Sequence, residues 1–116
     1  MVAGSTASRK AKGREHQKKI AGDIRTAFGL PEVDVVSRPM GSHGLDIMMS
    51  ERARALFPYG IECKRTEKLS IPAWWEQCWV NAESEGLRPL LVYKRNREEA
   101  MVVMRWVDFL KVVNDA

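Results

Sequence analysis

Apolar residues recur along this chain with two different periods, and these periods predict its helices and strands. Between Ile20 and Phe28 they return every four residues, which is typical of one helix face and predicts a helix at 13–28. A second stripe at helical spacing, followed by a glycine, predicts a helix at 72–85. The last apolar cluster indicates a short closing helix at 108–113.

Short apolar runs bounded by turn residues predict the strands. They lie at 33–38, 45–49, 59–65, 88–94 and 100–106. The fourth run is almost continuously apolar, as expected of a strand buried on both faces. The resulting order predicts a single-domain α/β protein with one mixed β-sheet and flanking helices, in which the second long helix connects two parallel strands.

Residues 1–12 differ from the rest because they are small, polar and basic. We expect them to form a disordered tail before a folded domain at 13–116. The net charge of +4 and the basic residues crowded into the first twenty positions suit a polyanion such as DNA, although a solvated tail that aids solubility explains them equally well. No apolar run is long enough to cross a bilayer, so we expect no membrane partner and a cytoplasmic location.

Glu62 and Lys64 are two residues apart on a predicted strand, so their side chains share one face. Alone, this pattern also fits an ordinary ion pair on an exposed strand. Asp46 changes the interpretation, because aspartate is unfavourable in strands and this one lies at the start of the preceding strand among apolar neighbours. If the two strands pair, Asp46 brings a second carboxylate to Glu62.

Two adjacent carboxylates repel each other unless a cation lies between them. Such an oxygen-rich site suits Mg²⁺ or Mn²⁺, and the carbonyl of Cys63 could add a further ligand. Lys64 beside the cation could position or deprotonate a water molecule, or stabilise charge on a phosphate. The combination predicts a site that cleaves phosphodiesters.

Two segments, Gly44-Leu45-Asp46 and Ile61-Glu62-Cys63-Lys64, resemble the motif of the PD-(D/E)XK nucleases, with Leu45 at the position of the motif's proline. Within that superfamily the chain is most similar to the small Holliday-junction resolvases. They share a glutamate in the first helix, matched by Glu15, and an arginine with a small-residue turn before the aspartate, matched by 38–42. They also share a proline that opens the second helix, matched by Pro72.

The resemblance implies a restriction-endonuclease-like core of order αβββαβ, followed by a terminal strand and a short helix. It implies that Asp46 and Glu62 bind metal, that Lys64 is catalytic and that Glu15 completes the catalytic set. Nucleases of this type often place a glutamine from the second helix near the site, which Gln77 matches, although a solvated glutamine is an equal alternative.

Several residues are candidates for contacts with DNA phosphates, and for each basic one a solvated charge is about as probable. They are Arg9, Lys10, Lys12, Arg14, Arg38, Ser42, Arg65 and Lys68.

These patterns predict a metal-dependent DNA endonuclease that hydrolyses phosphodiester bonds in branched DNA such as Holliday junctions. A two-fold homodimer would match such a substrate, in the host cytoplasm if the protein is phage-encoded. The alternative is a non-catalytic, structure-selective DNA-binding module on the same fold. The intact trio of Asp46, Glu62 and Lys64 discriminates between the two, because a pure binder gains nothing from burying a pair of carboxylates.

Overall fold

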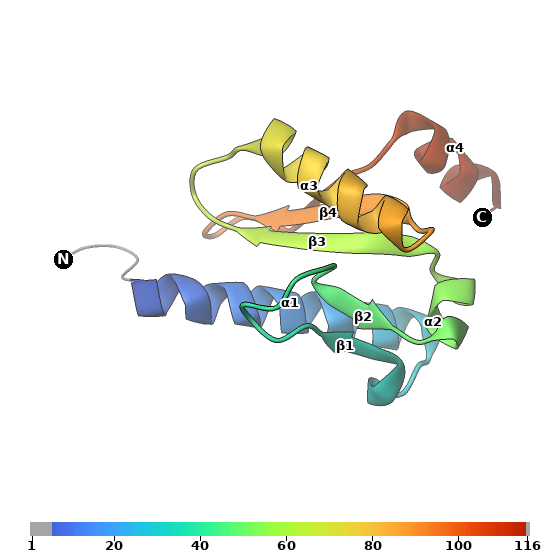
Figure 1. Ribbon diagram of the computed structural model, residues 1–116, viewed down its shortest axis with the longest axis horizontal. Helices are drawn as coiled ribbons and strands as arrows, with labels where there is room; N and C mark the ends of the chain where they lie inside the picture. The colour runs from blue at the N-terminus through green and yellow to red at the C-terminus, as the bar shows by residue number, and fades with distance from the viewer. Residues whose placement is uncertain (1–5, 116) are drawn as a thin grey trace.

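The computed structural model describes residues 6–115, and its elements follow the order expected from the sequence (Figure 1). They are α1 (Thr6–Phe28), the 3-10 helix η1 (Glu32–Asp34), β1 (Val35–Ser37), β2 (Ile47–Met49), α2 (Glu51–Leu56), β3 (Tyr59–Arg65), α3 (Ile71–Ser84), β4 (Arg88–Lys94), β5 (Met101–Val103) and α4 (Trp106–Asp115). The predicted α/β class, with mixed strand directions and flanking helices, is confirmed.

Helix α1 begins earlier than expected. Its first residue is Thr6, so the part of the predicted disordered tail at 6–12 is helical, while residues 1–5 lie outside the described part of the chain. Alanine, lysine and arginine dominate this stretch and are strong helix formers, which explains the extension. The basic residues at 9–12 therefore lie on a defined helical surface.

The strands form two hydrogen-bonded sheets instead of the single sheet expected. Strands β1 and β2 pair antiparallel, while β3 pairs parallel with β4 and β4 pairs antiparallel with β5. The two sheets meet at Asp46, whose backbone N–H donates to the carbonyl of Ile61 over 3.1 Å. Strand β2 begins at the next residue, Ile47, and belongs to the smaller sheet with β1.

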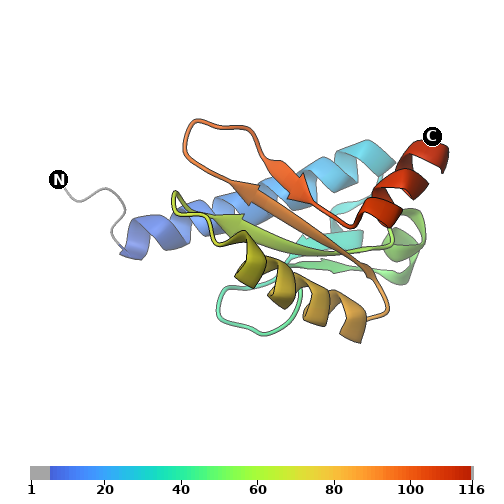
Figure 2. The same cartoon turned by 90° about the horizontal axis from the view of Figure 1, so that it is seen from above.

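Helices α1 and α3 cover opposite faces of the larger sheet (Figures 1 and 2). Ile61 and Cys63 belong to the core shared with α1. Gly60 lies against α3, since a Cβ there would come within 2.7 Å of the Cβ of Ala82. Because side chains alternate along a strand, Glu62 and Lys64 also point toward α3. None of the helices at 6–115 combines the length and apolar character needed to span a membrane.

Candidate active site

Asp46 is fixed at the junction of the two sheets by its backbone and by its side chain. Its carboxylate oxygen Oδ2 accepts a hydrogen bond of 2.7 Å from the backbone N–H of Cys63. Its carbonyl accepts from the N–H of Arg38 over 2.7 Å, and Nε of Arg38 donates to the carbonyl of Leu45 over 2.5 Å. These bonds hold both ends of the turn between β1 and β2, and so place Asp46 beside the middle of β3.

Glu62 lies next to Asp46 and is almost fully buried, with 1% of its surface exposed. Burial and the neighbouring Asp46 carboxyl raise the pKa of Glu62 to about 7, and the two carboxyl groups are within hydrogen-bonding reach of each other. The side-chain amide of Asn81 donates to Oε1 of Glu62 over 3.0 Å, which favours the ionised form. The structure therefore brings together the carboxyl pair that the sequence predicted.

Lys64 lies one step further along the same strand face. Its Nζ donates to Oε1 of Gln77 on α3 over 2.9 Å. Glu62 and Lys64 are about 6.6 Å apart along the strand, and Gln77 and Asn81 are about 6 Å apart along the helix. Because the two spacings match, α3 can place Gln77 at Lys64 and Asn81 at Glu62. The sequence reasoning selected Gln77 but missed Asn81, whose one available signal was its position four residues after Gln77.

Comparison of this chain with known protein families identifies the family to which it belongs. The family model described as "phage putative PDDEXK endonuclease" matches residues 8–116. The chain belongs to this family. The predicted membership of the PD-(D/E)XK superfamily is thereby confirmed, whereas the likeness to Holliday-junction resolvases stays a prediction. No curated protein and no solved structure gives a significant match.

PD-(D/E)XK nucleases generally use divalent metal ions, and the donor set of this family member fits such an ion. Burial first, and the charge of Asp46 second, raise the pKa of Glu62, and a hard dication bound between the two carboxylates would offset both effects. Within residues 6–115 the protein has no cluster of three or more His, Cys, Asp or Glu side chains suited to a metal. Two carboxylates suit Mg²⁺, which often keeps several waters.

Other predicted members of the site lie further from this pair. Glu15 is exposed on α1, in a cavity that it shares with Lys12 and Lys19, so its catalytic role stays a prediction from the resemblance. Its neighbour His16 is buried, with Nε2 3.1 Å from the carbonyl of Val92, and burial lowers the pKa of this imidazole. The sequence reasoning did not identify His16 as a core residue.

Cys63 contributes to the site through its backbone. Its N–H holds Asp46, and the role predicted for its carbonyl as a metal ligand is untested. Burial raises the pKa of the Cys63 thiol well above its ordinary value, as it raises that of Cys78 to about 11. Both thiols are therefore protonated and packed.

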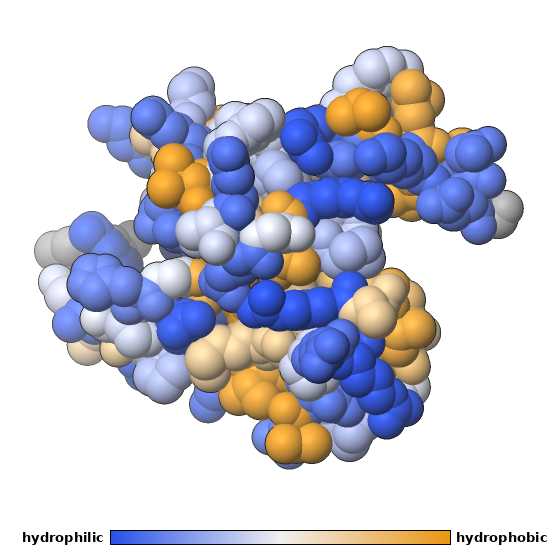
Figure 3. All heavy atoms as spheres, turned by 45° about the vertical axis from the view of Figure 1, so that its right-hand side comes forward, coloured by the Kyte–Doolittle hydropathy of each residue, from blue (hydrophilic) through white to orange (hydrophobic). Residues whose placement is uncertain are grey.

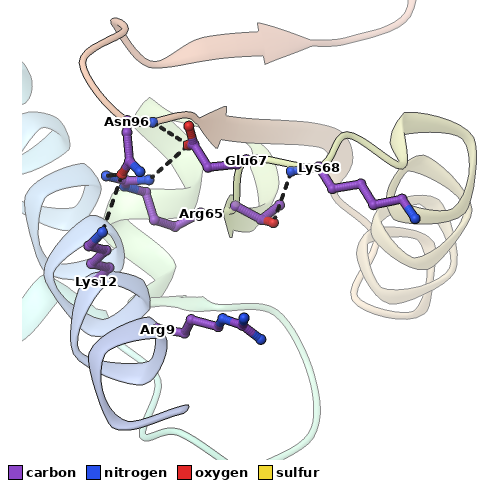
Figure 4. A pocket seen from close by; sticks show the side chains of 7 residues that line it. Arg9, Lys12, Arg65, Glu67, Lys68 and Asn96 are labelled. Carbon is purple, nitrogen blue, oxygen red and sulfur yellow. Dashed lines mark hydrogen bonds and ion pairs between the residues drawn. The ribbon is translucent and has the colours of Figure 1, made fainter. Parts of the chain in front are cut away.

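The residues predicted to contact DNA occupy three places. Arg9, Lys12, Arg65 and Lys68 line one cavity beside α1 (Figure 4). Lys10 and Arg14 are exposed elsewhere on α1. Arg38 and Ser42 belong to the turn before Asp46, where the Ser42 hydroxyl donates to the carbonyl of Pro39 over 2.7 Å.

Proposed function

We propose that this chain is a Mg²⁺- or Mn²⁺-dependent endonuclease that hydrolyses phosphodiester bonds in branched DNA, such as Holliday junctions, in the host cytoplasm. The observation that carries the proposal is the buried Glu62 carboxyl beside Asp46, with Lys64 on the same face. Membership of a phage endonuclease family supports the nuclease chemistry, and the excess of positive charge supports DNA as the substrate.

In this proposal Asp46 and Glu62 hold the cation, with the carbonyl of Cys63 as a further oxygen ligand. When bound, the cation supplies Lewis acidity, which lowers the pKa of water and neutralises charge on the phosphate. Asn81 orients Glu62 and favours its ionised form. Gln77 holds the ammonium group of Lys64 where it can donate to a phosphate oxygen as negative charge develops.

The alternative, a non-catalytic DNA-binding module, shares the basic surface but leaves the carboxyl pair without a purpose. Burying an ionisable group beside a like charge is costly, and such costs are concentrated at functional sites. The pair at Asp46 and Glu62 therefore favours the enzyme.

The direct test incubates the protein with a labelled four-way junction, a flap and a linear duplex, each with Mg²⁺, Mn²⁺ or EDTA. We expect cleavage in metal only, with the branched substrates cut faster. Asp46→Asn and Lys64→Ala should each lower the rate by about a hundredfold or more, as loss of a group that stabilises transition-state charge does. Glu32→Gln, at an exposed position on η1, is the matched control and should cut like the wild type. Cleavage in EDTA, or full activity of both site variants, would refute the mechanism.

The proposed enzyme is a homodimer that uses the C-terminal part of the chain. Helix α4 projects from the body of the protein, and its apolar side chains gather on the surface (Figures 1 and 3). Trp106 is 71% exposed, and Met101 and Val102 of the neighbouring strand β5 are more than half exposed. Because β5 has one unpaired edge, two copies can pair these strands antiparallel about a two-fold axis and cover both α4 helices.

Sedimentation of the wild type, Trp106→Ser and Val33→Ser tests the dimer. The wild type should sediment as a dimer at micromolar concentration and Trp106→Ser as a monomer. Val33→Ser removes an even more exposed apolar side chain from η1, outside the proposed interface, and should remain dimeric. A monomeric wild type would disprove this assembly.

A further inference from the structure

A basic groove runs along α1, on the opposite face of the larger sheet from Glu62 and Lys64. One cavity of 440 Å³ lies between α1 and the ends of β3 and β4 (Figure 4), and a second of 230 Å³ adjoins it. Lys12 and Arg65 line both cavities, so the two lie side by side. We call this feature the α1 groove, and its basic residues are Arg9, Lys12, Lys19, Arg65, Lys68 and Lys94.

The α1 groove keeps a net positive charge, because in the described part of the chain its six basic residues face only two acidic ones, Glu15 and Glu67. Glu67 is already engaged, because its Oε2 accepts from the backbone N–H of Asn96 over 2.5 Å and lies 3.8 Å from the guanidinium of Arg65. The side chains of Arg9 and Lys68 have no hydrogen-bond or ion-pair partner among residues 6–115. An open cavity bordered by unpaired cations and a fixed guanidinium suits a phosphate group.

The path from the active site to the α1 groove passes round the end of β3. Lys64 points to the α3 face, where it contacts Gln77, and the next residue, Arg65, points to the α1 face, where it contacts Asn96. A nucleic acid that reaches both residues must therefore turn sharply round the edge of the sheet. Duplex DNA has a persistence length of about 150 base pairs and resists such a turn, whereas a single strand is flexible enough to make it.

We propose that the α1 groove binds a single-stranded arm of the DNA whose scissile phosphate lies at Asp46 and Glu62. This inference rests on the proposed function and, among branched DNA, favours duplexes that carry a single-stranded branch over four-way junctions, whose arms are all duplex. Among residues 6–115 no aromatic side chain lines the two cavities, apart from the imidazole of His16, so the arm is held through its phosphates and without a marked preference for base sequence.

Two measurements on Arg9→Gln and Lys68→Gln test the inference, with Arg52→Gln as the matched control on α2, outside both cavities. The first is the affinity for a labelled single-stranded oligonucleotide in EDTA over a range of salt concentrations. Each lost phosphate contact should reduce the slope of log K against log salt by about 0.7. The control should keep the wild-type slope.

The second measurement compares cleavage rates in Mg²⁺ on a duplex with a single-stranded arm and on the same duplex without it. Each groove variant should lower the ratio of the two rates severalfold, and Arg52→Gln should leave the ratio unchanged. Unchanged slopes, or an unchanged ratio, in both groove variants would overturn the inference. If the wild type cuts neither substrate, the proposed endonuclease function fails, while the salt slopes still decide whether the α1 groove binds a single strand.

Discussion

Replacing Glu62 by glutamine should make the metal-free protein more stable at alkaline pH, although it removes a central residue of the candidate site. Glutamine has nearly the shape of glutamate and its carbonyl can still accept the hydrogen bond from Asn81. What the substitution removes is a negative charge that is 1% exposed and lies beside the carboxyl of Asp46. The folded wild type must bear that charge once the pH exceeds the pKa.

The pKa of Glu62 gives the sign and size of the effect. Folding raises it from an ordinary 4.5 to about 7, so between these values the folded state binds more protons than the unfolded state. The free energy of unfolding therefore falls as the pH rises through this window. A difference of this size, at 1.36 kcal/mol per pKa unit, corresponds to about 3 kcal/mol of stability present below pH 4.5 and lost above pH 7. Glu62→Gln should not show this loss.

The assay is thermal unfolding in EDTA at pH 5 and at pH 8, for the wild type, Glu62→Gln and the exposed control Glu99→Gln. At pH 8 the Glu62 variant should unfold about 10 °C above the wild type, whereas the control should follow the wild type at both pH values. Mg²⁺ at a hundred times its Kd should stabilise the wild type at pH 8 by about 2.7 kcal/mol and the Glu62 variant much less. A Glu62 variant that is less stable than the wild type at pH 8 in EDTA would refute this account of the carboxyl pair.

Two further predictions concern the support of the site by α3. Gln77→Ala and Asn81→Ala should each reduce kcat by a larger factor than they raise KM, because their amides orient the reacting groups. Single-turnover and steady-state assays measure both constants. A change in KM alone would argue against that role. Gly60→Ala should lower the free energy of unfolding by about 1–3 kcal/mol, because the new Cβ would overlap α3. Gly22→Ala in α1 should raise the free energy of unfolding by up to about 1 kcal/mol, because alanine favours the helix. Equal denaturation midpoints for the two variants would contradict this packing.

Local patterns in the sequence were enough to predict most elements and the proximity of Asp46 to Glu62. Strands β3 and β4 are long and apolar, and both were predicted with the bounds that the structure has. The alternation of side chains along β3 correctly placed Glu62 and Lys64 on one face. These features depend on periods of two residues, which a sequence displays directly.

Features that depend on tertiary contacts were harder to predict from the sequence. Residues 6–12 were predicted to be a disordered tail because they are polar, yet they extend α1. Within this stretch, Nζ of Lys12 donates over 3.4 Å to Oδ1 of Asn96, a residue that is distant in the sequence. Asn81 and His16 were missed for the same reason, since their partners Glu62 and Val92 lie on other elements. The α1 groove combines three separate segments, and no local pattern marks such a combination.

The division of the sheet at Asp46 connects the fold to the proposed chemistry. In a continuous sheet the N–H of Cys63 would donate to a backbone carbonyl of the neighbouring strand, whereas here it donates to the carboxylate of Asp46. At this point the side chain of Asp46 takes the place of a backbone acceptor in the sheet. The same hydrogen bond from Cys63 holds the Asp46 carboxylate beside Glu62. A scaffold selected only for stability or for binding DNA would gain from a regular ladder at this point. Local departures from regular structure of this kind are expected where a site requires them, which favours an enzyme over a simple binding module.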